Sequence, residues 1–434
     1  MASCPQEESI LKIAVSKSTL KGEISVPGSK SHTIRAIAIA AMADGVSKII
    51  APLISEDTVS ALGAASAFGA GVAKAPGVWT VTGTNGKIKA PGKTVDMGNS
   101  GTSLRIFSAL ASLSDSKISF DGDNSLRTRL MQPLLSALEL LGASAESAGG
   151  KCPLSIQGPL KGGKTRIEGK SSQFVTAVLL SCPLAPEDSE MEVFNLNEKP
   201  YVEITVDWMK RQNLIFDCNE SMTLFKIKGG QRYKPFELAI PADFSTACFP
   251  LIASAVTGST LRINNLDFND RQGDKEVFSF MEKMGMRVER SPLYTTVSPG
   301  ASGLSGAELD LNATPDALPA LAVAACFAKG RTVLGNVPQA RIKETDRIAC
   351  MTKELRKMGA KVEELEDGMI IHGGTPLHGT DVESYADHRI AMAMATAGLG
   401  ACGTTTVNDA ESAAVTYPAF YEDFRKLGAN FSEV

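Results

Sequence analysis

The chain repeats one pattern six times, and this period limits its possible folds more than any other feature. Six polar positions each precede a segment of alanine and other small or apolar residues, and successive positions are 71, 72, 72, 72 and 72 residues apart. They are Gly28, Asn99, Ser171, Asp243, Pro315 and Asp387. A fixed period on this scale is typical of a repeated supersecondary unit. The sequence therefore predicts six similar units.

Each unit has the same order of predicted elements. The first segment is apolar almost all round, which predicts a helix buried on every side. A short strand follows, as in residues 258–266, 330–337 and 403–410. An amphipathic helix comes next and ends at a glycine, namely Gly142, Gly285, Gly359 or Gly428, as expected for a helix C-terminus. With the strand-like segments that lead to the next unit, the pattern is βαβαββ.

Six units in 434 residues predict two domains of three units, with buried helices covered by sheets. We expect residues 20-239 to form the first domain, and residues 1-19 with 240-434 to form the second. The segment ILKIAV at residues 10–15 is a predicted strand that pairs with the second half. The chain would then cross between the domains twice.

Composition excludes several classes of protein. The net charge of −4 argues against a nucleic-acid-binding protein. The first residues lack the pattern of a signal peptide, and no apolar run approaches the ~20 residues of a membrane span. The eight cysteines are scattered and the four histidines lack zinc-ligand spacing. We expect free thiols, a cytoplasmic location and no metal site.

Basic residues accompany several predicted helix starts. They are Lys30, Arg35, Arg105 and Arg389. A purely architectural repeat explains polar N-caps such as Ser171 or Asp243. It does not explain the cations, because positive charge at a helix N-terminus opposes the helix dipole. A bound anion would account for them.

Two stretches carry the strongest signals for chemistry. The first, GSKSHTIR at residues 28–35, combines a glycine, two serines, the point charge of Lys30 and the bidentate fork of Arg35, without Walker A spacing. The second, RIKETDR at residues 341–347, places five charges in seven residues at a predicted helix start. A carboxylate between cations can donate or accept a proton with a pKa set by its ligand.

Seven motifs, in this order, resemble the EPSP synthase family of 3-phosphoshikimate 1-carboxyvinyltransferases. They are GSKSHTIR, GNSGTSLR, SSQF, KPYVEIT, the aspartate of PDA, RIKETDR and DHRIAMA. The resemblance covers about residues 18 to 430 and implies a two-domain inside-out α/β barrel of six βαβαββ repeats, three per domain, with the active site in the interdomain cleft. It implies transfer of the enolpyruvyl group of phosphoenolpyruvate to the 5-hydroxyl of shikimate 3-phosphate, in aromatic amino-acid biosynthesis, without metal or organic cofactor.

The resemblance also implies a role for each matching residue. Asp316 would be the general base near the 5-hydroxyl, Glu344 the proton donor to the methylene carbon, and Lys30 a catalytic residue that touches both substrates. Shikimate 3-phosphate would be bound by Lys30, Ser31, Arg35, Ser171, Ser172, Gln173, Asp316 and Lys343. Phosphoenolpyruvate would be bound by Lys30, Asn99, Gly101, Arg129, Gln173, Arg347 and Arg389.

The charges of the two substrates agree with this set. Each substrate carries a carboxylate and a phosphate, so the site must hold several negative charges. Six helix N-termini would supply about 0.3–1 kcal/mol each, and lysine and arginine must therefore do most of the neutralising. We expect these two small molecules to be the only partners of a monomer, with no nucleic acid and no membrane.

Four positions depart from the family pattern. Val415 stands where many members have a lysine that helps to bind phosphoenolpyruvate, and Gln339 stands where asparagine is common. Leu130 replaces a proline that usually follows Arg129. Glu198 replaces a serine that contacts the shikimate phosphate, so we expect its carboxylate to point away from the site or its loop to differ.

Two other functions have to be weighed. UDP-N-acetylglucosamine enolpyruvyl transferase shares the fold and the donor, but residues 121–127 lack its reactive cysteine, and GSKS replaces its lysine-asparagine motif. An inactive anion-binding paralogue is favoured by Val415. The retention of Lys30, Asp316 and Glu344 argues against it.

Overall fold

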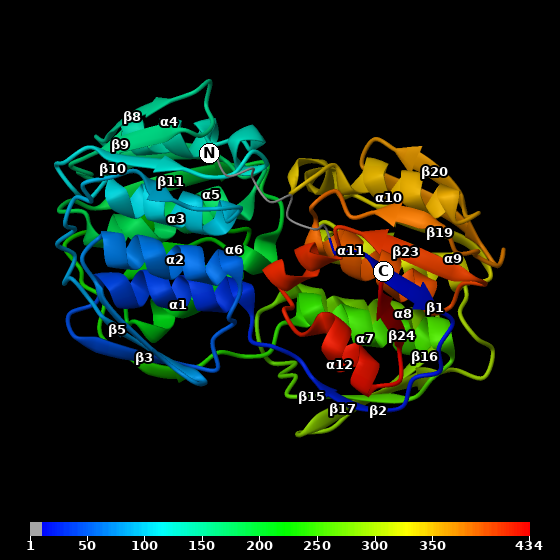
Figure 1. Ribbon diagram of the computed structural model, residues 1–434. Coiled ribbons are helices and arrows are strands. Elements are labelled where there is room, and N and C mark those ends of the chain that lie inside the picture. The colour runs from blue at the N-terminus through cyan, green and yellow to red at the C-terminus, as the bar shows by residue number, and fades with distance from the viewer. Residues whose placement is uncertain (1–10) are drawn as a thin grey trace, which may run out of the picture.

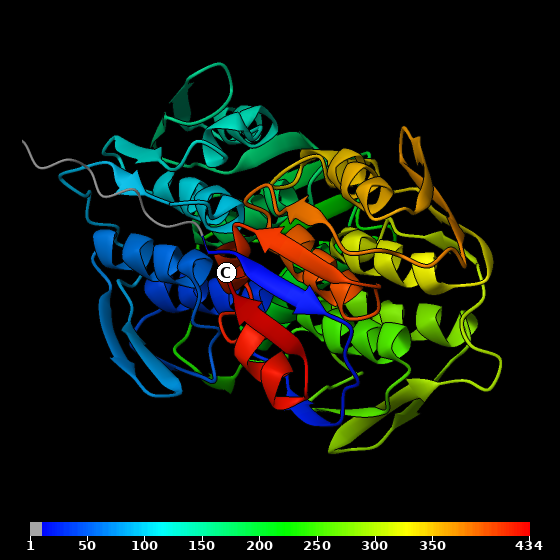
Figure 2. The ribbon, with the colours of Figure 1, turned by 45° about the vertical axis from the view of Figure 1, so that its right-hand side comes forward.

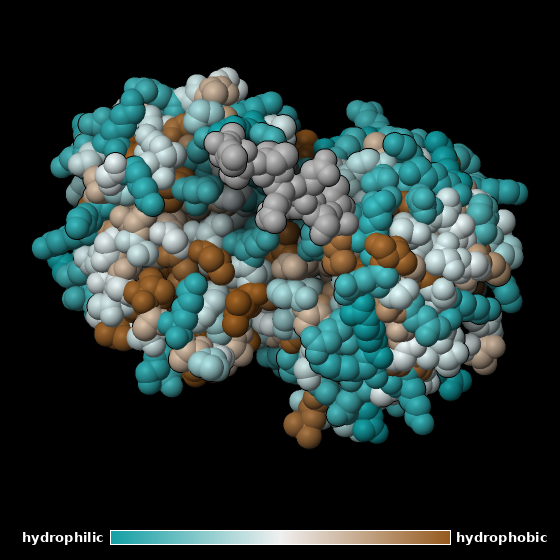
Figure 3. Space-filling view, viewed as in Figure 1, coloured by the Kyte–Doolittle hydropathy of each residue, from teal (hydrophilic) through white to brown (hydrophobic). Residues whose placement is uncertain are grey.

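The chain forms two lobes that meet at a waist (Figures 1 and 3). The computed structural model describes residues 11–434. One apolar core contains buried residues from Ile34 to Ile240, and the other contains residues 13–26 together with residues 242–431. The two lobes are therefore two domains, each with its own core.

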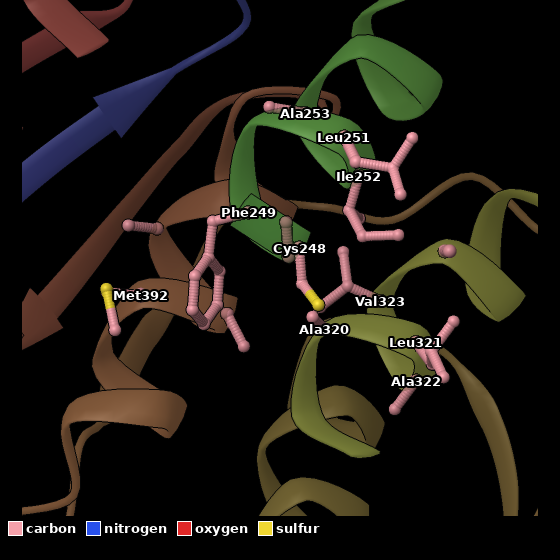
Figure 4. Close-up of a cluster of buried hydrophobic side chains, with 14 of the residues drawn as sticks. Cys248, Phe249, Leu251, Ile252, Ala253, Ala320, Leu321, Ala322, Val323 and Met392 are labelled. Atoms are coloured by element: carbon pink, nitrogen blue, oxygen red, sulfur yellow. The ribbon is translucent and has the colours of Figure 1, made fainter. Parts of the chain in front are cut away.

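The first helix of every unit is buried, as the sequence predicts. These helices are α1 (Lys30–Met42), α3 (Gly101–Ala111), α5 (Ser172–Ser181), α7 (Phe244–Thr257), α9 (Leu318–Phe327) and α11 (His388–Gly398). In the second domain α7, α9 and α11 contact one another. Figure 4 shows this centre, where Cys248 and Phe249 of α7 lie among Ala320 and Val323 of α9 and Met392 of α11. Small side chains let the three helices pack closely.

The second helices are amphipathic and end as predicted. They are α2 (Glu56–Ala67), α4 (Gln132–Leu140), α6 (Lys199–Arg211), α8 (Glu276–Lys283), α10 (Arg347–Lys357) and α12 (Phe420–Lys426). After four of them the predicted glycines have φ of +101°, +111°, +92° and +102°. Asn213 has φ +55° at the same place after α6. Glycine and asparagine adopt this left-handed conformation more readily than other residues.

Six four-stranded sheets cover the helices, one for each unit. In spatial order they are β14 (Glu237–Ala239), β3 (Val46–Ile50), β5 (Val78–Thr82) and β4 (Gly71–Ala75); β6 (Val95–Asp96), β7 (Ile118–Asp121), β9 (Leu154–Gln157) and β8 (Ser144–Ser147); β10 (Gly163–Glu168), β11 (Ser189–Phe194), β13 (Leu224–Ile227) and β12 (Phe216–Cys218); β2 (Gly22–Ser25), β15 (Leu261–Asn264), β17 (Tyr294–Pro299) and β16 (Met286–Arg290); β18 (Glu308–Asp310), β19 (Gly330–Gly335), β21 (Gly368–Gly373) and β20 (Lys361–Leu365); β22 (Asp381–Glu383), β23 (Thr404–Asn408), β1 (Ile13–Ser16) and β24 (Asn430–Glu433). In each sheet the first pair is parallel and the other two pairs are antiparallel. The predicted βαβαββ unit is thus present six times.

Three strands belong to units from which they are distant in sequence. β14 is the first strand of unit one, although it follows unit three, and β2 is the first strand of unit four, although it precedes unit one. β1 lies between β23 and β24 and completes unit six. Figures 1 and 2 show β1, in dark blue, beside these red strands. The predicted pairing of residues 10–15 with the second half is confirmed for its described part.

The predicted start of the first domain at residue 20 is too early. Leu20, Ile24 and Val26 pack in the second core, since β2 pairs with β15. The chain crosses at residues 26–29 and returns at residues 240–243. The two crossings are hydrogen-bonded to each other, because Ser29 N donates to Pro241 O (2.8 Å) and Asp243 N donates to Pro27 O (2.9 Å).

Two absences can be stated for residues 11–434. None of the helices in this range has the length and apolar character needed to cross a membrane. The cysteines in this range are free thiols.

Candidate functional site

A cavity between the domains brings together most of the predicted site residues. The first domain lines it with Lys30, Ser31, Arg35, Asp57, Gly101, Thr102, Arg129, Ser172, Gln173, Glu198 and Tyr201, and the second domain with Asp316, Lys343, Glu344, Arg347 and His388. An adjoining cavity adds Arg105, Ser171 and Gln339 and shares Arg129, Gln173, Glu198, Lys343 and Glu344. Residues from five repeats therefore meet in one place.

Helix starts surround the cavity, with one correction to the expectation that all six would point into it. Lining residues come from the first turns of α1, α3, α5 and α11 and from η4 (Pro315–Ala317), which precedes α9. α7, which is described in full, contributes none. Its N-cap Asp243 instead accepts a hydrogen bond from Lys30 N (3.2 Å), because the two interdomain crossings run side by side here.

Lys30 faces the cavity next to a carboxylate that the sequence motifs did not include. Its Nζ lies 3.1 Å from Asp57 Oδ2, and the two side chains are 14% and 6% exposed. Asp57 stands in the first turn of α2, where the helix dipole favours an acid. The ion pair with Asp57 therefore fixes the orientation of the Lys30 side chain. Ser31, the next residue, also lines the cavity.

Arg35 is a buried residue of the cavity lining, and its hydrogen-bond partners are all uncharged. It donates to Ser31 O (2.9 Å), Tyr201 O (2.9 Å), Thr176 Oγ1 (3.1 Å) and Thr205 Oγ1 (2.9 Å). Burial lowers the pKa of Arg35 to about 10, so the guanidinium remains a cation at neutral pH. Its positive charge is available to an anion in the cavity.

Arg129 reaches across the cleft and is oriented by its own domain. Nη2 donates to Asn99 Oδ1 (2.5 Å) and to Ser125 Oγ (3.2 Å), and Nη1 lies 3.6 Å from Glu344 Oε1. Asn99 in turn donates to Asp123 Oδ2 (2.6 Å). Asn99 is therefore placed to position the arginine.

The start of α5 joins the two cavities. Ser171 caps the helix by accepting from Gln173 N (3.4 Å). The side chain of Gln173 accepts from Arg105 Nη1 (2.5 Å). Burial lowers the pKa of Arg105 to about 10, and the guanidinium lies 5.1 Å from the ring of Phe174. From the sequence, Arg105 was one of the basic residues near predicted helix starts, and no ligand was predicted for it.

One of the two alternatives expected for Glu198 is wrong. Its side chain does not point away from the site, because the residue is 2% exposed and lines both cavities. Ser172 donates to it from its backbone N (3.2 Å) and from Oγ (2.7 Å), and Lys343 forms an ion pair with it. The repulsion that we expected is avoided because these partners already form an anion site, and the carboxylate occupies it.

Arg347 holds three carboxylates and is 1% exposed. It donates to Asp316 Oδ1 (2.8 Å), Glu344 Oε2 (2.6 Å) and Asp387 Oδ2 (2.8 Å). Lys343 Nζ also lies 3.7 Å from Asp316. The charge run at residues 341–347 is therefore not a solvated surface, since Arg347 at the start of α10 turns inward.

Asp316 and Glu344 are both ionised in this environment. Burial acts to raise the pKa of Asp316, but the cations Lys343, Arg347 and Arg389 outweigh it and hold the pKa well below its ordinary value. For Glu344, burial is likewise outweighed, chiefly by Arg347 and Arg129, and its pKa is also well below the ordinary value. Both groups are thus deprotonated: Asp316 is a weak base while these cations pair with it, and Glu344 must gain a proton before it can donate one.

Thr102, Tyr201 and His388 line the cavity and lie in the sequence motifs, although no role was assigned to them. Tyr201, from KPYVEIT, has its hydroxyl 3.1 Å from Asp274 Oδ2 and 3.4 Å from Asp316 Oδ2. Burial and the charge of Asp316 raise the pKa of Asp274 to about 7. His388, from DHRIAMA, is buried, and burial holds its pKa well below the ordinary value.

Four residues of interest lie at the margin. Arg389 is buried behind Asp316, with Nη2 3.8 Å from Oδ2. Val415 ends η6 (Ala410–Val415), outside the lining of the cavity. Gln339 donates to Asn312 O (2.9 Å) at the adjoining cavity, and Leu130 is 39% exposed at its rim.

Comparisons with known proteins agree over nearly the whole chain. The sequence model of EPSP synthase (3-phosphoshikimate 1-carboxyvinyltransferase) matches residues 15–424. The chain belongs to the EPSP synthase family. A 3-phosphoshikimate 1-carboxyvinyltransferase of Acetivibrio thermocellus is 45% identical over 97% of this chain and 99% of its own length. One of Ruminiclostridium cellulolyticum is 44% identical over 96% and 98%.

The structural comparison extends the match to the EPSP synthase fold. An EPSP synthase structure from Acinetobacter baumannii covers 98% of this chain and 100% of its own, with a TM-score of 0.82 and 28% identity. The expected two-domain fold with three repeats per domain is therefore that of the family.

Proposed function

We infer that the chain transfers the enolpyruvyl group of phosphoenolpyruvate to the 5-hydroxyl of shikimate 3-phosphate, giving 5-enolpyruvylshikimate 3-phosphate and phosphate. This is a step of the shikimate pathway, which leads to aromatic amino acids. Besides family membership, one observation supports this function most: Arg347 holds Asp316 and Glu344 side by side in a cleft lined by cations from both domains. A base and an acid are thus close enough to act on one pair of substrates.

The acceptor would lie against α1 and α5. Its binding residues are Lys30, Ser31, Arg35, Ser171, Ser172, Gln173, Asp316 and Lys343. Asp316 takes the proton of the 5-hydroxyl, and the oxygen then attacks C2 of phosphoenolpyruvate. The depressed pKa keeps Asp316 in the carboxylate form that a base needs but also makes it a weak base, so pairing of Lys343 and Arg347 with the substrates' anions must first raise that pKa.

The donor would lie between Arg129 and Arg347. Its binding residues are Lys30, Asn99, Gly101, Arg129, Gln173, Arg347 and Arg389. The donor's carboxylate and phosphate would pair with Arg129 and Arg347 and neutralise part of their charge. The pKa of Glu344 then rises toward its ordinary value. Glu344 can then carry the proton that it gives to C3, which becomes a methyl group. Loss of phosphate from C2 and of a proton from C3 restores the double bond.

An assay of phosphate release tests this proposal. Phosphoenolpyruvate is supplied with shikimate 3-phosphate, with UDP-N-acetylglucosamine, or alone. We expect release with shikimate 3-phosphate only. Turnover with the nucleotide sugar alone would support the other transferase, and no turnover with either acceptor would support an inactive anion-binding paralogue.

Gly101→Ala is expected to raise the KM for phosphoenolpyruvate about tenfold, a loss of ~1.4 kcal/mol in binding. A Cβ at Gly101 would lie 2.8 Å from Arg105 Nη1 and 3.0 Å from Arg129 Nη1, so both guanidinium groups would have to shift. Gly63→Ala in α2 is the matched control, because a Cβ there meets nothing within 4 Å. Steady-state kinetics should leave Gly63→Ala unchanged. An unchanged KM in Gly101→Ala would remove Arg129 from the donor site.

We further propose that the chain acts as a monomer in the cytoplasm. Free thiols at the described cysteines support a reducing compartment.

A further inference from the structure

Glu198 stands between the two domains and is bound on both sides. Within the first domain it receives two hydrogen bonds from Ser172, at the N-terminus of α5. From the second domain it receives the ammonium of Lys343. A backbone donor at a helix start, a hydroxyl and a lysine together are a typical set of partners for an anion.

The proposed function assigns Ser172 and Lys343 to the binding of the acceptor, which carries a phosphate, and the present inference rests on that assignment. We propose that the Glu198 carboxylate competes with this phosphate, and that the acceptor binds by displacing Glu198 from Ser172. Glu198 is then a residue of this chain that sets the affinity for the acceptor. No part of the reaction itself passes through it.

Ser172 has too few hydrogens to bind the Glu198 carboxylate and a phosphate at the same time, so one anion must replace the other. The backbone N–H and the hydroxyl of Ser172 each have one hydrogen to donate, and Glu198 Oε2 accepts both. A phosphate oxygen cannot receive them while the carboxylate remains. Lys343 differs, because an ammonium has three hydrogens and can bind both anions at once.

Charge also favours exchange over sharing. Five cations and four carboxylates line the cavity, so its positive charge is largely neutralised by the protein itself. A phosphate placed beside a buried carboxylate would meet like charge at low dielectric. Moving Glu198 out leaves Ser172 and Lys343 to the phosphate.

The backbone of Glu198 indicates how the carboxylate is held. Its φ is +56°, a left-handed conformation that is uncommon for a residue other than glycine, asparagine or aspartate. Such a conformation persists where surrounding contacts require it. Within residues 11–434, Ser172 and Lys343 are the residues that hold the Glu198 carboxylate by hydrogen bonds and an ion pair.

Titration calorimetry compares the wild type with Glu198→Ser, Glu198→Gln and the control Glu203→Gln. Glu203 lies in α6, which begins directly after Glu198, but it pairs with Lys199 (3.8 Å). The probes are shikimate 3-phosphate and inorganic phosphate. We expect Glu198→Ser to bind both roughly tenfold more tightly than the wild type, Glu198→Gln to show a smaller gain, and Glu203→Gln to show none.

Kinetics and Lys343 give a second readout. In Glu198→Ser the KM for the acceptor should fall, while the KM for phosphoenolpyruvate changes little. In a Lys343→Gln background the gain from Glu198→Ser should be smaller, since part of the competition is for Lys343. If Glu198→Ser raised the affinity equally in the Lys343→Gln background, the Glu198–Lys343 ion pair would have no role in the competition.

Two results would overturn the inference itself. One is unchanged or weaker binding of both probes in a Glu198→Ser protein that unfolds at the wild-type temperature. The other is an equal gain in Glu203→Gln, which would reduce the effect to net charge. Failure of the proposed function is distinct: the wild type would then release no phosphate from phosphoenolpyruvate with shikimate 3-phosphate, whereas binding of inorganic phosphate would still test Glu198.

Discussion

Glu344→Gln is expected to lower kcat by about 10²–10⁴-fold, the usual contribution of a placed acid or base. Glutamine keeps the size of the side chain and can still accept from Arg347 Nη2, which now lies 2.6 Å from Oε2. It has no proton to give to the methylene carbon. The change should therefore reduce kcat much more than it raises either KM.

The measurement separates proton transfer from binding. Exchange of deuterium from solvent into the methylene group of phosphoenolpyruvate, in the presence of shikimate 3-phosphate, should be lost together with turnover. Asp346→Asn is a suitable neighbour for comparison, because Asp346 caps α10 by accepting from Ala349 N (3.0 Å) and lines a neighbouring cavity rather than the one that holds Asp316. A Glu344→Gln enzyme within a few-fold of the wild-type kcat would show that another group is the acid.

Lys30→Met is expected to lower kcat/KM by about 10²–10⁴-fold. The proposal gives Lys30 a contact with each substrate, and a hydrogen bond to a charged group is worth about 1.5–3 kcal/mol. Methionine fills similar space without the charge. Both KM values should rise, unlike in Glu344→Gln, and kcat should fall as well if Lys30 also stabilises the charge of the reaction.

A second substitution at Asp57 separates the loss of stability in Lys30→Met from its loss of activity. Without Lys30 the buried Asp57 carboxylate loses its cation at 3.1 Å, and an unpaired buried charge destabilises the fold. The double variant Lys30→Met/Asp57→Asn should recover stability in thermal unfolding but not activity. Recovery of activity together with stability would show that Lys30 is structural. Lys48→Met, on the exposed face of β3, is the control for loss of a lysine.

Much of the site was predictable because the repeat places its landmark residues at equivalent positions in every unit. Each landmark lies where a buried helix begins, so Lys30, Gly101, Ser172 and Asp316 were expected in one cleft, and all four line it. Asp57 was not predicted, because a single acid in the first turn of a helix is ordinary in sequence. Only its distance to Lys30 makes it part of the site.

The error at Glu198 has a different cause. From the sequence, an acid in place of a serine that contacts a phosphate predicts repulsion, and we expected the side chain to turn away or the loop to differ. The tertiary structure instead brings Lys343 to it from another repeat, 145 residues further along the chain. Whether a carboxylate is repelled or bound depends on charges that the local sequence does not contain.

The sequence by itself determined the repeated unit, because apolar periodicity and helix-terminal glycines act over a few residues. It also determined the family and the residues available for chemistry. Only the tertiary structure decided which strand completes which sheet, with β14 in unit one and β2 in unit four. It also decided which carboxylate meets which cation. Both depend on backbone hydrogen bonds and charges that come together only when distant segments pack, so local sequence patterns cannot specify them.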